Sequence, residues 1–181
     1  MIRKLLFVLG GILLGGVIHI AIVFLVPYYA SRDAWALMQQ FGPDGAFHVL
    51  PVPQAGAEPL ASLDPRMLQA VCRFSLADGP VRVRAAFPDE FWSVAVFDRR
   101  GRNVYSLNDR SAEQSRLDLA ILTPLQMAQL RQDPPQSLET AIVLEVSINV
   151  GFALLRAFVP DESLLASATA SMTAADCAAE L

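Results

Sequence analysis

The sequence predicts a mainly β protein, in which a single N-terminal transmembrane helix precedes an antiparallel β sandwich or partly closed barrel with two or three peripheral helices. Three observations predict this fold class. Residues 5–26 form one apolar run that is long enough to cross a bilayer. From residue 66 onward, apolar residues alternate with polar ones or stand in short unbroken runs, as they do in β-strands. Turn residues separate these runs at short intervals.

Length and composition limit the possible classes of protein. The chain has 181 residues, of which 54% are hydrophobic, and its 14 basic and 18 acidic residues give a net charge of −4. This length allows one domain of ordinary size beside the membrane segment. The apolar content argues against a disordered chain. The acidic balance argues against a nucleic-acid partner, whose phosphates need a basic surface.

Residues 1–30 are predicted to be a short cytoplasmic tip and a transmembrane signal anchor. The apolar run carries no charged side chain apart from the titratable His19, and as a helix it would span about 33 Å, against a hydrocarbon core of about 30 Å. Arg3 and Lys4 precede it, which favours a cytoplasmic N-terminus. Two tyrosines follow it and suit the opposite interface. We therefore expect a single-pass protein of the bacterial inner membrane, with its C-terminal domain in the periplasm.

A cleaved secretory signal is the competing interpretation of this run. The apolar core of a signal peptide has about 7–15 residues and ends at a cleavage site with small residues at positions −3 and −1. The run here is longer. Ala30 would suit position −1, but Tyr28 would then stand at −3. These features favour an uncleaved anchor.

Small residues mark one face of the predicted membrane helix. Gly11 and Gly15 have the four-residue spacing that lets a second helix approach closely, and His19 lies one turn further along the same face. The three residues are a candidate helix–helix interface, most simply with another single-pass membrane protein. The alternative is that the spacing arises by chance, because glycine is common in membrane helices, and that this face contacts lipid.

Residues 31–65 are predicted to be a juxtamembrane helix and a connector. Ser31 is a suitable N-cap for a short helix over residues 32–41, which Gly42 and Pro43 would end. The connector that follows is rich in proline and glycine and has room for one short strand at residues 47–52.

Residues 66–181 are predicted to be the extracytoplasmic β domain with a C-terminal helix. Its strands are predicted at residues 81–87, 91–98, 103–107, 117–122, 141–148 and 152–159. The run 91–98 is apolar on both faces, which is typical of a central strand. Residues 98–103 form the turn of one predicted hairpin, and residues 149–151 form that of a second.

Two helices are predicted within this domain. Thr123, Pro124 and Gln126 form a capping box with proline at the first helical position, so a helix begins there and runs to about Gln132. The final helix is predicted to start after Asp161 and to fade into the alanine-rich tail.

The two cysteines, Cys72 and Cys177, are predicted to form a disulfide. Both lie beyond the anchor, in a compartment where paired thiols oxidise, and only one intramolecular pairing is possible. Cys72 is expected on an early strand, and Cys177 lies in a tail that has little apolar patterning of its own. The alternative is a pair of free thiols.

No residue pattern in the sequence indicates a reaction, so no catalytic residue, metal or cofactor is predicted. His48 is the only histidine outside the membrane run, and neither a nucleophile elbow nor a phosphate-binding glycine loop is present. Cys72, Cys177 and His48 are too scattered for a zinc site. Asp118 and Glu145 fall within apolar strands, where alternation places them on outward faces.

Polar side chains are densest between residues 98 and 110. Asp98, Asn108 and Arg110 form a candidate ligand cluster, because arginine forks bind carboxylates and other anions. Arg99 and Arg100 stand in the same stretch. The alternative is a solvated hairpin tip and a salt-bridged strand end, with Asp98 and Arg110 as a structural ion pair.

The run 91–98, its hairpin and the segment 103–110 resemble the bacterial domain-of-unknown-function family 1254. The turn at residues 78–81 and the anchor followed by residues 31–35 resemble its small membrane-anchored members. Larger members join this domain to a second one, family 1214, in a soluble β-rich protein. The small anchored members resemble the first half alone, and the second half is often a separate anchored protein. The resemblance therefore implies a partner and no particular reaction.

Two functions of different kinds follow from these observations. The first is a single-pass inner-membrane protein whose extracytoplasmic β domain is an interaction or accessory module, paired with a family 1214 protein or a larger membrane complex. The alternative is a cell-envelope enzyme or a small anionic-ligand binder. A pocket lined by Asp98, Asn108 and Arg110 would favour the alternative, and an exposed apolar patch beside the anchor would favour the first.

Overall fold

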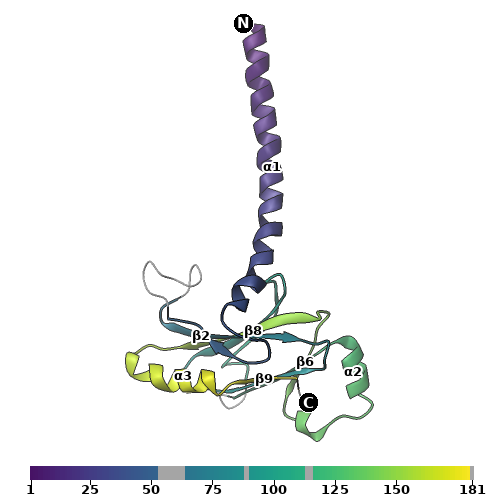
Figure 1. The fold of residues 1–181 in the computed structure, drawn as a ribbon, viewed down its shortest axis with the longest axis vertical. Helices are drawn as coiled ribbons and strands as arrows, with labels where there is room; N and C mark the ends of the chain where they lie inside the picture. The colour runs from purple at the N-terminus through teal and green to yellow at the C-terminus, as the bar shows by residue number, and fades with distance from the viewer. Residues whose placement is uncertain (53–63, 88–89, 113–115, 180–181) are drawn as a thin grey trace.

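A long N-terminal helix stands on a domain built from two β-sheets (Figure 1). The computed structural model describes residues 1–52, 64–87, 90–112 and 116–179. The predicted fold class is confirmed: the described strands form a mainly β domain of two separate sheets, with helices at its periphery. They form no closed barrel, so the sandwich is the better of the two predicted descriptions.

The first sheet has five strands, all antiparallel, in the order β1-β2-β8-β4-β5. They are β1 (His48–Val49), β2 (Met67–Ser75), β4 (Trp92–Asp98), β5 (Asn103–Asn108) and β8 (Val150–Phe158). The ladder between β2 and β8 runs for the full nine residues of each strand. The predicted hairpin of β4 and β5 is present, and the apolar run of β4 has a hydrogen-bonded neighbour on each side.

The second sheet has four strands in the order β7-β6-β3-β9. They are β3 (Val81–Ala86), β6 (Arg116–Leu122), β7 (Ile142–Glu145) and β9 (Asp176–Ala178). The strand β9 was not predicted, because three residues are too few to show a period of two.

The second predicted hairpin is wrong. The strands β7 and β8 belong to different sheets, and β7 pairs with β6 in parallel. The chain passes from one sheet to the other between Val146, whose N–H binds the carbonyl of Leu122, and Asn149, whose carbonyl accepts from Leu76. The sequence of residues 149–151 is typical of a turn, but Val150 and Gly151 are the first residues of β8, which forms its long ladders with β2 and β4.

The main hydrophobic core lies between the two sheets. Trp92 is 1% exposed and stacks on Phe87 with 4.5 Å between ring centroids. The helix α3 (Leu165–Thr173) contributes Ala168 and Met172 to the same core. Alternate residues of each strand face this core, which is why the period of two was visible in the sequence.

The N-terminal helix α1 (Ile2–Gln39) is continuous, which corrects the prediction of a separate helix capped by Ser31. Its last turns pack on the five-stranded sheet through Trp35 and Met38, and this tertiary contact stabilises helix where the sequence suggested a break. The part Ile2–Val26 has a mean hydropathy of 2.5 and none of it is buried. This is one helix long and apolar enough to cross a membrane, a property that a signal sequence shares.

The other predicted elements are close to their observed positions. The helix α2 (Pro124–Leu130) begins with the complete capping box of Thr123 and Gln126. Single 3-10 turns, η1 (Gln136–Leu138) and η2 (Glu162–Leu164), precede β7 and α3. The predicted strand at residues 47–52 is reduced to β1, and the connector residues 53–63 lie outside the described residues.

Candidate functional site

The end of α1 and the five-stranded sheet meet in a small second core. Leu50, Val71 and Phe152 are buried there. The side chains packed around them are those of Trp35, Met38, Phe41, Phe97 and Leu154. Val71 lies beside Cys72, which faces the main core, so alternation places this second core on the opposite face of the sheet. The apolar helix is therefore mounted directly on the β domain.

Arg73 fixes the junction between the end of α1 and the five-stranded sheet. Its side chain is 9% exposed, forms an ion pair with Asp44 and donates a hydrogen bond of 3.2 Å to the carbonyl of Gly42. Its guanidinium carbon lies 5.2 Å from the centre of the Trp35 ring, within range of a cation–π contact. One buried cation on β2 thus contacts both α1 and the turn that follows it.

His48 and Gly42 complete the same turn. Nε2 of His48 lies 2.9 Å from the carbonyl oxygen of Pro43 and donates to it. Gly42 has a φ of +156°, and a Cβ on it would collide with the ring of His48. The only histidine of the β domain therefore has a structural partner, and the sequence offers no sign of this contact because it depends on the fold of the turn.

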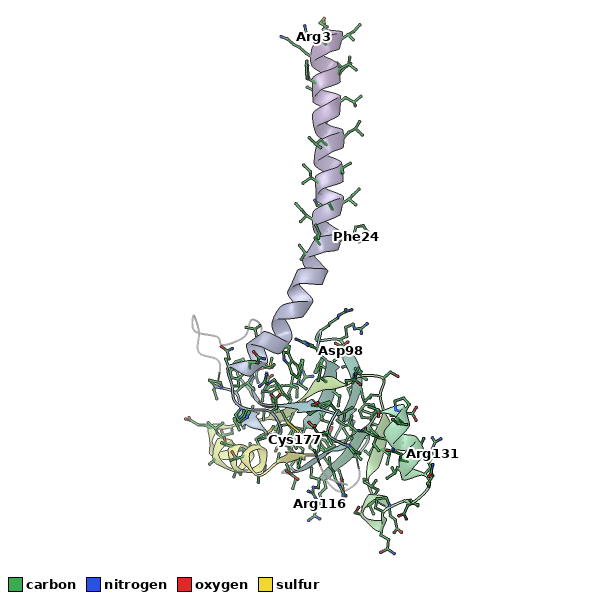
Figure 2. All side chains as sticks on the ribbon, turned by 45° about the vertical axis from the view of Figure 1, so that its right-hand side comes forward. Arg3, Phe24, Asp98, Arg116, Arg131 and Cys177 are labelled. Atoms are coloured by element: carbon green, nitrogen blue, oxygen red, sulfur yellow. A yellow bond between two sulfur atoms is a disulfide. The ribbon has the colours of Figure 1, made fainter. Side chains whose placement is uncertain are left out.

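The tip of the β4–β5 hairpin carries three arginines beside this junction. Arg99 and Arg100 are exposed, and the guanidinium carbon of Arg99 lies 6.0 Å from the centre of the Trp35 ring. Nε of Arg102 donates to a carboxylate oxygen of Asp98 at 2.7 Å. Figure 2 shows Asp98 on the side of the domain from which α1 rises. We call Arg99, Arg100 and Arg102 the arginine tip.

Asp98 shapes the arginine tip. Its carboxylate also accepts hydrogen bonds from the backbone N–H groups of Arg100 at 2.8 Å and Arg102 at 2.9 Å. Burial of Asp98 raises the pKa of its carboxyl group, but these bonds and the nearby charge of Arg102 outweigh burial, so the pKa lies below its ordinary value. The carboxylate is therefore ionised at neutral pH and holds the turn in one shape.

The structure does not bring the three residues of the predicted ligand cluster together. Asn108 pairs with Ser93 at the far end of the hairpin, about 17 Å from Asp98 along β4 by the rise of a strand. Asn108 instead accepts a bond of 3.2 Å from the backbone N–H of Arg110. The ion pair expected between Asp98 and Arg110 is also wrong, because Asp98 pairs with Arg102. Asp98 lies at the turn of the hairpin and Asn108 at its open end, although the two residues are close in sequence.

The three residues of the predicted helix–helix interface lie on the exposed part of α1. A Cβ added at Gly11 or Gly15 would have no atom within 4 Å, and the whole of Ile2–Val26 is unburied. Gly11, Gly15 and His19 thus stay a predicted helix–helix interface.

The predicted disulfide between Cys72 and Cys177 is present, with an S–S distance of 2.06 Å. Cys72 lies on β2 in the five-stranded sheet and Cys177 on β9 in the four-stranded sheet, and both are almost fully buried. The bond therefore crosslinks the two sheets through the core and holds the C-terminal strand in place.

A further ion pair, on the four-stranded sheet, was not predicted. Nε and Nη2 of Arg82 donate to the two carboxylate oxygens of Asp118 at 2.8 and 2.7 Å, and Nη2 also donates to the carbonyl of Ser137 at 2.7 Å. The hydrogen bond to Asp118 raises the pKa of Arg82 above its ordinary value. Asp118 faces outward as expected, but its partner depends on the register of β3 and β6, which the sequence does not reveal. This pair is structural.

Among the described residues, no group of three or more His, Cys, Asp or Glu side chains is placed to hold a metal ion. A groove of about 470 Å³ is lined by residues that include Arg84, Arg116, Asp118 and Asp176, and it contains none of the predicted ligand cluster.

Comparison with known proteins gives a family and a fold. The model of a family described as "Protein of unknown function (DUF1254)" matches residues 45–178. No curated protein matches the chain.

Two crystal structures are similar. The VPA0106 protein from Vibrio parahaemolyticus has a TM-score of 0.62 and 14% identity over 83% of this chain and 35% of its own. An uncharacterised protein from Burkholderia cenocepacia has a TM-score of 0.41 and 17% identity over 61% of this chain and 31% of its own. The chain thus spans about a third of the length of these proteins, and the likeness to the Vibrio protein shows a shared fold.

Proposed function

The chain belongs to the DUF1254 family, and we propose that it is a single-pass membrane protein of the bacterial cell envelope whose β domain is an interaction or accessory module. The observation that carries the proposal is the junction. An apolar helix of 25 residues is wholly exposed, yet its last turns are packed on the sheet and fixed by Arg73. A soluble protein rarely leaves so large an apolar surface uncovered. A bilayer around Ile2–Val26 would cover it.

The disulfide supports a periplasmic position for the β domain. Disulfides persist in oxidising compartments and are rare in the bacterial cytosol. Arg3 and Lys4 before the apolar run support a cytoplasmic N-terminus. The continuity of α1 to Gln39 favours an anchor over a cleaved signal, because cleavage near residue 30 would cut within the helix.

We expect alkaline phosphatase fused to the C-terminus to be active, because that enzyme folds only where its own disulfides can form. The purified fusion should also retain the N-terminal peptide when it is analysed by mass spectrometry. A matched fusion to β-galactosidase, which works only in the cytoplasm, should be inactive. The opposite pair of activities would contradict the orientation, and loss of the N-terminal peptide would show cleavage.

The helix face of Gly11, Gly15 and His19 supports pairing with a second membrane protein. The two glycines leave a strip without side chains, so another helix can approach the backbone closely. Leu37 and Val52, which stand close in sequence to the second core, are also exposed apolar residues. The resemblance to the family's anchored members suggests a family 1214 protein or a larger membrane complex as the partner.

Replacing both Gly11 and Gly15 by Ile should lower the association of the helix in a membrane two-hybrid assay about tenfold, because two branched side chains push the backbones apart. A tenfold loss corresponds to about 1.4 kcal/mol, the scale of one strong interhelical contact. The matched control is Gly10→Ile with Gly16→Ile, which places the same bulk off the stripe. Equal signals from both double variants and the natural chain would mean that the stripe faces lipid.

The alternative function, an enzyme or a binder of small anionic ligands, has no support from the arrangement of its candidate residues. It required Asp98, Asn108 and Arg110 to converge on an anionic ligand, and the hairpin holds Asp98 at the opposite end from the other two. We propose no reaction for this chain.

A further inference from the structure

The arginine tip and the membrane helix lie on the same side of the β domain. The hairpin tip at Asp98 is close to the lower end of α1, whereas Arg116 is on the far side and Arg131 on the flank (Figure 2). Contact between the guanidinium group of Arg99 and the ring of Trp35 on α1 agrees with this placement. In the described part of the chain, Arg99 and Arg100 take part in no ion pair.

We infer that the arginine tip binds the anionic headgroups of the phospholipid bilayer that holds α1, and so orients the β domain against the membrane surface. This inference rests on the proposed membrane anchoring. It adds a second contact with the bilayer, made by the domain itself, which the family membership does not imply.

The height of the tip above the bilayer is set by α1. Trp35 follows Val26, the last residue of the apolar part, by nine residues, or about 14 Å of helix. The headgroup layer occupies about 5–8 Å of that height. The remaining gap between Trp35 and the outer edge of the headgroup layer is about 6–9 Å. A typical helix tilt of about 20° would narrow this gap on one side of α1. An extended arginine side chain spans most of such a gap, which is also close to the Debye length of about 8 Å at physiological salt.

The tip is built before it meets lipid. Asp98 accepts three hydrogen bonds from Arg100 and Arg102, and Gly101 has a φ of +77°, so the turn has one defined shape. With the charge of Arg102 balanced by Asp98, Arg99 and Arg100 remain as two exposed positive charges. Guanidinium groups bind phosphate through paired hydrogen bonds. The chain as a whole has a net charge of −4, so this pair of exposed arginines is a local positive site on a protein that is negative overall.

The test uses the full chain in lipid nanodiscs of phosphatidylcholine alone or with about 30% phosphatidylglycerol. Amide hydrogen exchange is measured in the peptide that covers residues 98–103. Each arginine near an anionic surface strengthens binding about five-fold. We therefore expect exchange at the tip to be at least five-fold slower in the anionic discs at 150 mM salt, and to return to the neutral-disc rate near 1 M salt, where the Debye length is about 3 Å.

The variant Arg99→Gln with Arg100→Gln should lose the difference between the two lipids. The matched control, Arg116→Gln with Arg131→Gln, removes two charges away from the tip and should keep it. Equal exchange in both lipids for the natural chain would overturn the lipid contact, as would an unchanged difference in the tip variant.

Elution of the chain with the discs separates this failure from failure of the proposed function. A chain that elutes with both kinds of disc but shows no lipid-dependent exchange is anchored and has no tip contact. A chain that elutes apart from both kinds of disc is not anchored, and that result would overturn both proposals.

Discussion

Reduction of the disulfide between Cys72 and Cys177 is expected to lower the free energy of unfolding of the β domain by about 2–5 kcal/mol. The bond closes a loop with a sequence separation of 105 residues, and opening it restores conformational freedom to the unfolded chain. It also releases β9, which pairs with β3 through only three residues. This loss is comparable with much of the stability of a single domain.

The measurement is urea unfolding of the full chain in detergent micelles, with and without reductant, followed by circular dichroism. Reduction removes the crosslink without removing any side chain, so the oxidised protein is its own matched control. The double variant Cys72→Ala with Cys177→Ala should be at least as unstable as the reduced protein. Equal unfolding midpoints for the oxidised and reduced protein would contradict the prediction. They would mean that other contacts hold β9 in place without the crosslink.

Replacing Trp92 by Ala should lower the free energy of unfolding by about 3–5 kcal/mol, the usual cost of removing a large aromatic residue from a core. The Trp92 ring lies between the sheets and stacks on Phe87, so its loss leaves a cavity that backbone ladders on both sides of β4 prevent from closing. Among the described residues the indole nitrogen of Trp92 has no hydrogen-bond partner, so the expected loss is one of packing.

The matched control is Phe91→Ala at the neighbouring position. Phe91 is 42% exposed and carries a side chain of the same class, so its replacement should change the unfolding free energy by less than about 1 kcal/mol. Urea unfolding of both variants measures the difference. Similar losses in the two variants would mean that the strand is sensitive to any substitution and that the stack of Trp92 on Phe87 has no special weight.

Trp92 also illustrates which features are readable from the sequence. The strand β4, which contains Trp92, was predicted to be central because both of its faces are apolar. The structure shows what covers each face. One face meets the main core, and the other meets the second core beneath α1, which contains Phe97. The pattern indicated that both faces are covered and could not indicate that the C-terminal end of α1 covers one of them.

The candidate site shows the same division. The sequence drew attention to the charged stretch that begins at Asp98, and the arginine tip lies within it. It grouped Asp98 with Asn108 and Arg110, which the hairpin separates, and it gave no sign of Arg73, which holds the junction. Which side chains meet across a hairpin or beneath a helix depends on register and on contacts between distant segments.

The features that could be predicted correctly from the sequence are local, or involve the only candidates that the chain offers. These are the apolar run, the period of two in most strands, the capping box at Thr123 and the pairing of the only two cysteines. Three other features are visible only in the folded chain, namely the parallel pairing of β7 with β6, the continuity of α1 through Ser31 and the position of Arg99 beside Trp35. Local patterns reflect which face of an element is buried, whereas these three features depend on which distant element buries it, and that is set by the packing of the whole chain.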